Sequence, residues 1–210
     1  ADTVLEVKHS VFDRIMVEKK SKFNKDHKED FTWQNMRETA LAYKGEILSR
    51  RGKDSIPSDP HEQVLKVLRA VKASWGKSET YRKNRNITGD WSNGTAVIIQ
   101  AMVYGNIKGN SGAGVAYSRD PNTAKNGIWG DFKWFCQGRD LADHSSGQVL
   151  NIQELRNERW FRDLNLKIEM LDCLFGGSIV ENEFTVQFGE PHVLQVRDAY
   201  LPPNCTKFLY

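Results

Sequence analysis

The sequence predicts an α+β chain with two parts, a helical subdomain and linker over residues 1–90 and a lobe of mostly antiparallel sheet over residues 91–210. Apolar residues recur at helical spacing in the first part, and the period changes to that of strands after Trp91-Ser-Asn-Gly94. The chain then closes on a two-faced hairpin pattern. With 39% hydrophobic and 27% charged residues among 210, the composition is that of a globular protein.

Two helices are expected within residues 12–49, because their apolar residues are spaced by three or four positions. A charged connection, residues 18–30, separates them, and Thr32 suits the N-cap of the second helix. A third helix is expected to begin at Pro60, since Asp59 can cap it and proline fits the first helical position. Its apolar face carries Val64, Leu65, Leu68, Val71 and Trp75.

A glycine-rich loop lies between two strand-like runs in the second part. Residues 95–104 are rich in β-branched and apolar side chains and predict a buried strand, and Gly114 to Ser118 is expected to return as the next strand. Such a loop can present backbone N–H groups to phosphate, although most glycine-rich hairpins are structural. Residues 154–174 return to a helical pattern.

The closing hairpin, Glu183–Arg197, has apolar residues at even positions and polar residues at odd positions. The polar set is Glu181, Glu183, Gln195 and Arg197. A three-residue turn at residues 189–191 would place Glu183 opposite Arg197 and all four polar side chains on one face. From the pattern alone, this face is equally well a solvated surface or a binding site.

Charge and composition restrict the partners. The formal net charge is +3, from 30 basic and 27 acidic residues, and no basic stripe alternates with aromatics, which argues against nucleic acid. No apolar run approaches the ~18–20 residues of a membrane span, and residues 1–10 lack a signal-peptide pattern. We therefore expect a cytoplasmic chain, with organelle targeting of a longer parent left open. The widely spaced Cys136, Cys173 and Cys205 favour free thiols over disulfides or zinc.

Two stretches carry a resemblance to a known family. The segment from Gln100 to Asn106, followed by Ser111-Gly-Ala-Gly-Val-Ala-Tyr-Ser-Arg-Asp-Pro121, resembles the nucleotide-binding domain of pyruvate phosphate dikinase, an ATP-grasp enzyme. The segment Glu183–Arg197 resembles the closing element of its ATP site, in which an acid-x-Glu-Phe-Thr strand precedes a Leu-Gln-x-Arg strand. The resemblance implies that the second part is an ATP-grasp-like lobe.

The same resemblance implies a site for ATP and Mg²⁺. Glu183 and Gln195 would supply oxygen ligands to the metal, which prefers oxygen, and Glu181 would take the place of an aspartate at the nucleotide. Arg197 would act in catalysis by contacting phosphate or orienting the acids. The other implied nucleotide contacts are Gln100, Met102 and Val103 at the adenine, Gly109, Ser111, Gly112 and Gly114 at the triphosphate, and Asp140.

The sequence also departs from the family pattern. The motif Gln-Gly-Glu-Asp reads Gln137-Gly-Arg-Asp140, so that a base replaces an acid. Neither the Val-Arg-Ser-Gly motif of the family's N-terminal lobe nor the phosphorylated histidine in its Thr-Ser-His context is found. We therefore expect part of a longer polypeptide whose missing N-terminal lobe and phosphohistidine domain would be its partners, with inactivity in isolation.

The implied reaction converts ATP, phosphate and pyruvate to AMP, pyrophosphate and phosphoenolpyruvate, in a parent enzyme that could form a homodimer. Two other readings stay open. One is the nucleotide domain of a phosphoenolpyruvate synthase or a glucan dikinase. The other is a non-catalytic nucleotide-binding or regulatory module of the same fold, which Arg139 favours.

Overall fold

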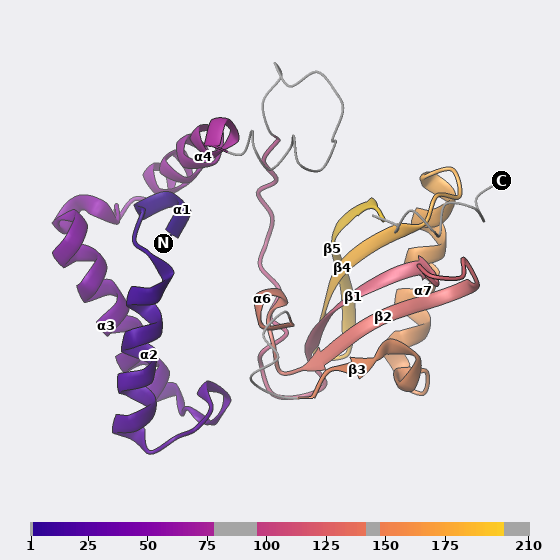
Figure 1. Cartoon of the computed structure of the whole chain (residues 1–210), viewed down its shortest axis with the longest axis horizontal. Helices are drawn as coiled ribbons and strands as arrows, with labels where there is room; N and C mark the ends of the chain where they lie inside the picture. Colours follow the sequence, from indigo (N-terminus) through magenta and orange to yellow (C-terminus); the bar gives the residue numbers. More distant parts are fainter. Residues whose placement is uncertain (1, 78–95, 142–147, 200–210) are drawn as a thin grey trace. The chain divides into compact units, whose positions relative to one another are not determined.

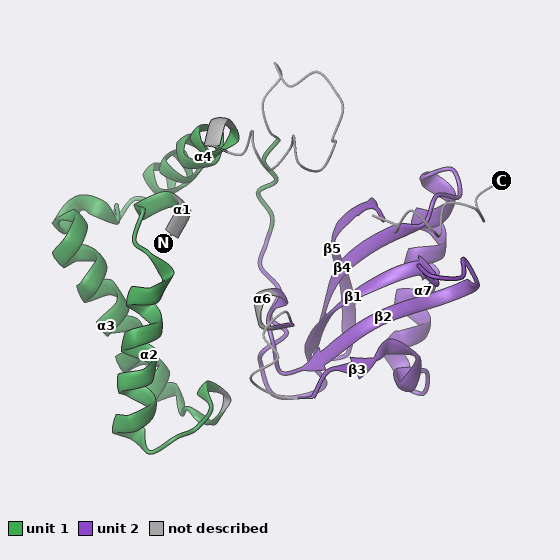
Figure 2. Cartoon of the chain, viewed as in Figure 1, with its two compact units in different colours: residues 1–100 green, residues 101–210 purple. Residues whose placement is uncertain are grey.

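The computed structural model describes residues 2–77, 96–141 and 148–199 of the chain. It divides into two compact units, Ala1–Gln100 and Ala101–Tyr210 (Figure 2). The fold class is α+β, as predicted: the first unit is helical and the second contains an antiparallel sheet. The boundary predicted near residue 90 lies outside the described residues. In the described part of the chain, no helix combines the length and apolar character needed to cross a membrane.

The helices of unit 1 follow the sequence pattern, except that the first long helix continues through residues 18–23, which were predicted to belong to the connection. They are α1 (Asp2–Leu5), α2 (His9–Phe23), α3 (Trp33–Arg51) and α4 (Pro60–Lys77), with α2 and α3 packed side by side (Figure 1). Thr32 caps α3 as predicted, because its Oγ1 accepts from the Asn35 N–H at 3.2 Å while Asn35 Oδ1 accepts from the Thr32 N–H at 3.0 Å. The predicted cap of α4 is confirmed as well, since Asp59 Oδ1 accepts from the His61 N–H at 3.2 Å.

Unit 2 is built on a five-stranded antiparallel sheet of order β3-β2-β1-β4-β5. Its strands are β1 (Gly112–Arg119), β2 (Asn126–Trp134), β3 (Leu150–Asn151), β4 (Val180–Gln187) and β5 (Glu190–Asp198). A short helix, α6 (Gly138–Leu141), follows β2, and a 3₁₀ turn (Ile152–Leu155) precedes α7 (Arg159–Leu174). Helix α7 lies across one face of the sheet (Figure 1).

The core of unit 2 lies between α7 and this face. Trp160, Leu164 and Ile168, four residues apart, turn one side of α7 towards the buried rings of Phe132 and Phe184. Glycines make room for these rings. A Cβ on Gly112 would lie 2.2 Å from Phe132 Cζ, and one on Gly114 would lie 2.6 Å from Phe184 Cε1. Packing alone therefore requires both glycines.

The strand predicted for residues 95–104 is wrong for its described residues, 96–104. They carry no strand, and Ile98 and Met102 are 78% and 65% exposed. A strand is stabilised by a hydrogen-bonded neighbour and by cover for its apolar face. This segment has β-branched residues, but it pairs with no strand among the described residues.

The closing hairpin has a different turn from the one predicted. Gln187 pairs with Glu190, which leaves a two-residue turn in which Phe188 and Gly189 have φ of 52° and 81°. The register then shifts between Phe184, which pairs with Val193, and Glu183, which pairs with Gln195. Leu194 is the extra residue of this β-bulge. Without it, Gln195 would face α7 as Val193 does, so the bulge places Gln195 and Arg197 on the face opposite α7.

Candidate functional site

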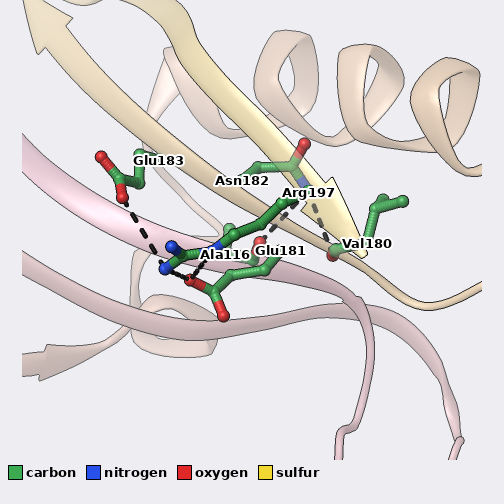
Figure 3. A network of polar contacts seen from close by, with 6 residues as sticks. All are labelled: Ala116, Val180, Glu181, Asn182, Glu183 and Arg197. Carbon is green, nitrogen blue, oxygen red and sulfur yellow. Dashed lines mark hydrogen bonds and ion pairs between the residues drawn. The ribbon is translucent and has the colours of Figure 1, made fainter. Parts of the chain in front are cut away.

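Four polar side chains come together on the face opposite α7, as the alternation predicted. Across β4 and β5, Glu181 pairs with Arg197 and Glu183 pairs with Gln195, so the predicted pairing of Glu183 with Arg197 is wrong. Figure 3 shows Arg197 beside Glu181 and Glu183, with Asn182 between them in sequence and directed to the other side of β4. The period of two residues places Asn182, which is fully buried, on the α7 side.

The two glutamates have different surroundings. Arg197 Nε donates to Glu181 Oε1 at 2.9 Å, and its Nη2 also contacts this oxygen. The same Nη2 lies 3.8 Å from Glu183 Oε1. The Glu181 side chain is 13% exposed and the Glu183 side chain 43%. The hydrogen bond to Glu181 is the main cause of a raised pKa for Arg197. The Glu181 carboxylate is therefore engaged by the guanidinium, whereas most of the Glu183 carboxylate can still bind a cation.

Tyr117 extends this group onto the central strand and was missed in the sequence. It pairs with Glu181 across β1 and β4, so the phenol and that carboxylate are neighbours on the same face. Burial, the charge of Glu181 and hydrogen bonding to it raise the pKa of the phenol, in that order of importance. Tyr117 has an odd number in β1, as does Val115, which pairs with Glu183. This alternation places Tyr117 on the same face as the glutamates and could have identified it from the sequence. The buried Lys133 of β2 faces the same way and was missed too.

The glycine-rich loop packs against the tip of the closing hairpin. The Gly189 N–H donates to the Asn110 carbonyl at 2.8 Å, and the Phe188 N–H donates to Ser111 Oγ at 3.0 Å. Ser111 Oγ in turn donates to the Gly109 carbonyl at 2.9 Å. The structure thus brings together two motifs that the sequence analysis treated separately.

The predicted triphosphate residues fall into two groups. Ser111 is fully buried with its hydroxyl used inside the protein, and Gly112 and Gly114 lie in β1 under aromatic rings. Gly109 is exposed, and its φ of +93° suits glycine. Gly109 is therefore the member of this set with backbone open to solvent, whereas the other three shape the loop and the strand that follows it.

Side-chain amides hold the segment predicted to meet adenine. Gln137 Nε2 donates to the Val103 carbonyl at 3.3 Å, and Gln137 Oε1 accepts from the Gly105 N–H at 3.1 Å. Gln187 Oε1 accepts from the Tyr104 N–H at 2.6 Å. Met102 is exposed, as is Gln100, which belongs to unit 1. The backbone of Asp140 lies in α6, and its side chain is outside the described residues.

The chemistry of the Glu183 and Gln195 pair suits a hard cation. One carboxylate and one amide oxygen face the same side from adjacent strands, and Gln195 is exposed. Mg²⁺ commonly takes one or two carboxylates and completes its octahedron with phosphate oxygens and water. Within the described ranges, no group of three or more His, Cys, Asp and Glu residues is arranged to hold a metal. The pair offers two oxygen ligands of the kind that such a cation takes.

Comparison with curated proteins finds relatives along nearly the whole chain. It is 32% identical to pyruvate, phosphate dikinase of Clostridium symbiosum over 95% of its length, and 30% identical to the chloroplastic pyruvate, phosphate dikinase of Flaveria trinervia over 93%. Pyruvate, phosphate dikinase of Giardia intestinalis is also 30% identical over 93%. The chain spans 23%, 20% and 23% of these relatives. The similarity thus includes the helical stretch before Asp59. No protein-family model matches.

Proposed function

Because this chain is related over nearly its full length to one part of the pyruvate, phosphate dikinases, we propose that its open sheet face forms one side of an ATP·Mg²⁺ site in a phosphotransferase of that kind. The observation that carries the proposal is the convergence of Glu183, Gln195 and Arg197 on one face of the hairpin whose tip contacts the glycine loop. Oxygen ligands and a guanidinium together match the charges of a metal-bound triphosphate.

Each residue of the face has a distinct proposed role. Glu183 and Gln195 hold the cation, which neutralises phosphate charge when it is bound. Arg197, with 54% of its side chain exposed, contacts phosphate oxygens through the donors that Glu181 leaves free. Glu181 orients Arg197 and reaches the nucleotide through it. None of these residues is a nucleophile, so their contribution is positioning and charge stabilisation.

The glycine loop and the segment before it complete the proposed contacts. The backbone of Gly109 approaches the triphosphate, while Ser111, Gly112 and Gly114 keep the loop and β1 in place. Gln100, Met102 and Val103 contact the adenine when the nucleotide is bound. The Val103 carbonyl accepts a hydrogen bond from Gln137. Asp140 is the remaining proposed nucleotide contact.

At the level of a longer protein, we propose the reaction of the dikinase relatives. ATP would phosphorylate a histidine on another domain, phosphate would take the γ-phosphoryl group, and pyruvate would become phosphoenolpyruvate. The partners of this chain are then a basic lobe across the nucleotide and the phosphohistidine domain, in a parent that could be homodimeric. A phosphoenolpyruvate synthase or glucan dikinase would use the same face.

A second candidate, a non-catalytic nucleotide-binding or regulatory module, is favoured by one specific feature. Arg139 stands where the family motif has an acid, next to Asp140. A base at this position changes the charge presented to the nucleotide and the metal. This candidate predicts nucleotide binding that does not depend on Mg²⁺.

Calorimetric titration of the 210-residue chain with ATP, with and without Mg²⁺, separates these possibilities. We expect weak Mg²⁺-dependent binding, with a Kd on the order of 0.1–1 mM for the contacts of one lobe. Glu183→Gln should abolish the Mg²⁺ dependence, because it removes the carboxylate of the metal pair. Glu169→Gln, on an exposed position of α7 that bonds Asn165, is the matched control and should bind as the wild type does. Equal affinity with and without Mg²⁺ would contradict the metal assignment.

A further inference from the structure

We propose that Tyr117 is a positioning residue of this face, whose hydroxyl holds the Glu181 carboxylate against Arg197. The proposal gives a role to a residue outside the metal pair and the glycine loop. Its consequence for ligand binding rests on the proposed function, whereas the arrangement itself does not. It is carried by a single row of side chains that crosses three neighbouring strands.

The register aligns the three side chains directly. Tyr117 on β1 pairs with Glu181 on β4, and Glu181 pairs with Arg197 on β5. Directly paired residues in antiparallel strands have Cβ atoms about 4.5–5.5 Å apart, so neighbours in a row interact. Glu181 therefore lies between a phenol on one side and a guanidinium on the other. β1 is the middle strand of the sheet, which makes Tyr117 the most firmly held member of the row.

The contacts of Glu181 match this placement. Arg197 donates to Glu181 Oε1 from both Nε and Nη2, and the register places the Tyr117 phenol on the other side of the carboxylate, where its hydroxyl would act as a further donor. A carboxylate held by donors from two sides cannot rotate without breaking one of them. Burial and the Glu181 charge raise the pKa of Tyr117, so the phenol stays protonated near neutral pH and remains a donor.

The row has a consequence for Glu183. With Glu181 fixed, the Arg197 fork is held so that its Nη2 lies 3.8 Å from Glu183 Oε1, beyond a direct hydrogen bond. Losing the phenol would free Glu181 to rotate, and Arg197 could then close on Glu183. Tyr117 thus keeps the more exposed of the two glutamates available to a cation.

The test measures hydrogen exchange of the Arg197 Nε–H by NMR near neutral pH in the 210-residue chain. Tyr117→Phe removes only the hydroxyl and should speed this exchange about 3- to 10-fold, as expected for the loss of one hydrogen bond in the network. Tyr43→Phe is the matched control. Tyr43 is also partly buried with a raised pKa, but its ring packs on Phe12 in unit 1. It should leave the Arg197 signal unchanged.

The outcomes decide the proposal separately from the proposed function. Faster exchange in Tyr117→Phe with an unchanged unfolding midpoint supports it, because general loosening of the sheet would lower the midpoint. Exchange equal to that of the wild type overturns it, and so does an equal acceleration in Tyr43→Phe. ATP·Mg²⁺ titration of the same variants is the second arm. If the wild type does not bind ATP·Mg²⁺, the proposed function fails, while the exchange result still decides the role of Tyr117.

Discussion

Glu181 and Glu183 have the same side chain and lie two residues apart on one strand, yet the fold separates their roles. The difference comes from the residues that pair with each glutamate on the two neighbouring strands. Glu181 lies between Tyr117 and Arg197, whereas Glu183 lies between Val115 and Gln195. An aliphatic neighbour and an amide leave a carboxylate with more of its charge unmatched than a phenol and a guanidinium do. The residue better suited to bind a cation is therefore Glu183.

Asp120, which follows β1, provides a pH-dependent test at the residue scale. Its Oδ2 accepts from Thr123 Oγ1 at 2.6 Å and its Oδ1 from the Asn122 N–H at 2.9 Å. These bonds lower the pKa of Asp120 from 3.8, and the bond from Thr123 contributes most. A lowered folded-state pKa means that the ionised carboxylate stabilises the fold above pH 3.8. This stabilisation is lost as the pH falls through the folded-state value.

We expect Thr123→Val to raise the pKa of Asp120 back towards 3.8. The ¹³C shift of the Asp120 carboxyl group, followed during an acid titration, measures it. Asp120→Asn should lower the free energy of unfolding at neutral pH, and this difference should shrink as the pH falls. An unchanged Asp120 pKa in Thr123→Val would show that the hydroxyl does not stabilise the ionised form.

At the scale of elements, the closing hairpin shows what a sequence pattern can and cannot specify. Alternation has a period of two, so it correctly assigns Glu181, Glu183, Gln195 and Arg197 to one face. It does not specify the partners. A two-residue turn with a bulge at Leu194 and a three-residue turn without one put the same residues on the same face, and only the packing of Phe184 and Val193 against α7 distinguishes them.

Other parts of the site could not be read from local sequence. The docking of the glycine loop depends on Ser111 meeting Phe188, 77 positions away in the chain. Residues 96–104 have strand-like composition, but strand formation depends on a partner that a local pattern does not reveal. Helices α3 and α4 were predictable because Thr32 and Asp59 cap them within a few residues.

Gly114→Ala tests whether glycine in β1 is required by packing. The added Cβ would lie 2.6 Å from Phe184 Cε1 and 2.6 Å from the Asp131 carbonyl oxygen, and the strand backbone cannot yield easily. We expect a loss of about 1–3 kcal/mol in the free energy of unfolding of unit 2, as for other overpacked cores. Denaturant titration followed by tryptophan fluorescence measures it, since Trp160 lies in this core.

Gly138→Ala in α6 is the control, because a Cβ at Gly138 meets nothing within 4 Å. Its free energy of unfolding should stay within about 0.5 kcal/mol of the wild type. If Gly114→Ala were as stable as this control, the close packing of Phe184 on β1 would not be what requires glycine.

At the scale of the whole molecule, the chain spans 20 to 23% of the dikinases named above. The described sheet face presents Arg197 to a ligand from β5, and no Val-Arg-Ser-Gly or Thr-Ser-His motif occurs in the 210 residues. A triphosphate needs more cationic neutralisation in a catalytic site than a metal, Arg197 and the buried Lys133 of this face provide. Binding and catalysis should therefore separate in this chain.

We expect the purified 210-residue chain to form no pyrophosphate, phosphohistidine or phosphoenolpyruvate from ATP, phosphate and pyruvate. Product analysis by ³¹P NMR measures all three. In a longer chain that carries the basic lobe and the histidine domain, ATP turnover should appear, and Glu183→Gln should lower it about 10²-fold. Vigorous Mg²⁺-dependent ATP cleavage by the 210 residues would contradict the proposal that this chain binds ATP but does not catalyse its cleavage.

The position of the cation is the most direct test of the proposed site. Mn²⁺ can replace Mg²⁺ beside ATP and broadens the NMR signals of nearby nuclei. We predict that Mn²⁺ with ATP broadens the amide signals of Glu183 and Gln195 first, then those of their neighbours on β4 and β5. Glu183→Gln should suppress the effect. Broadening centred elsewhere in the chain, or the same broadening with Mn²⁺ in the absence of ATP, would contradict a nucleotide-dependent metal site on this face.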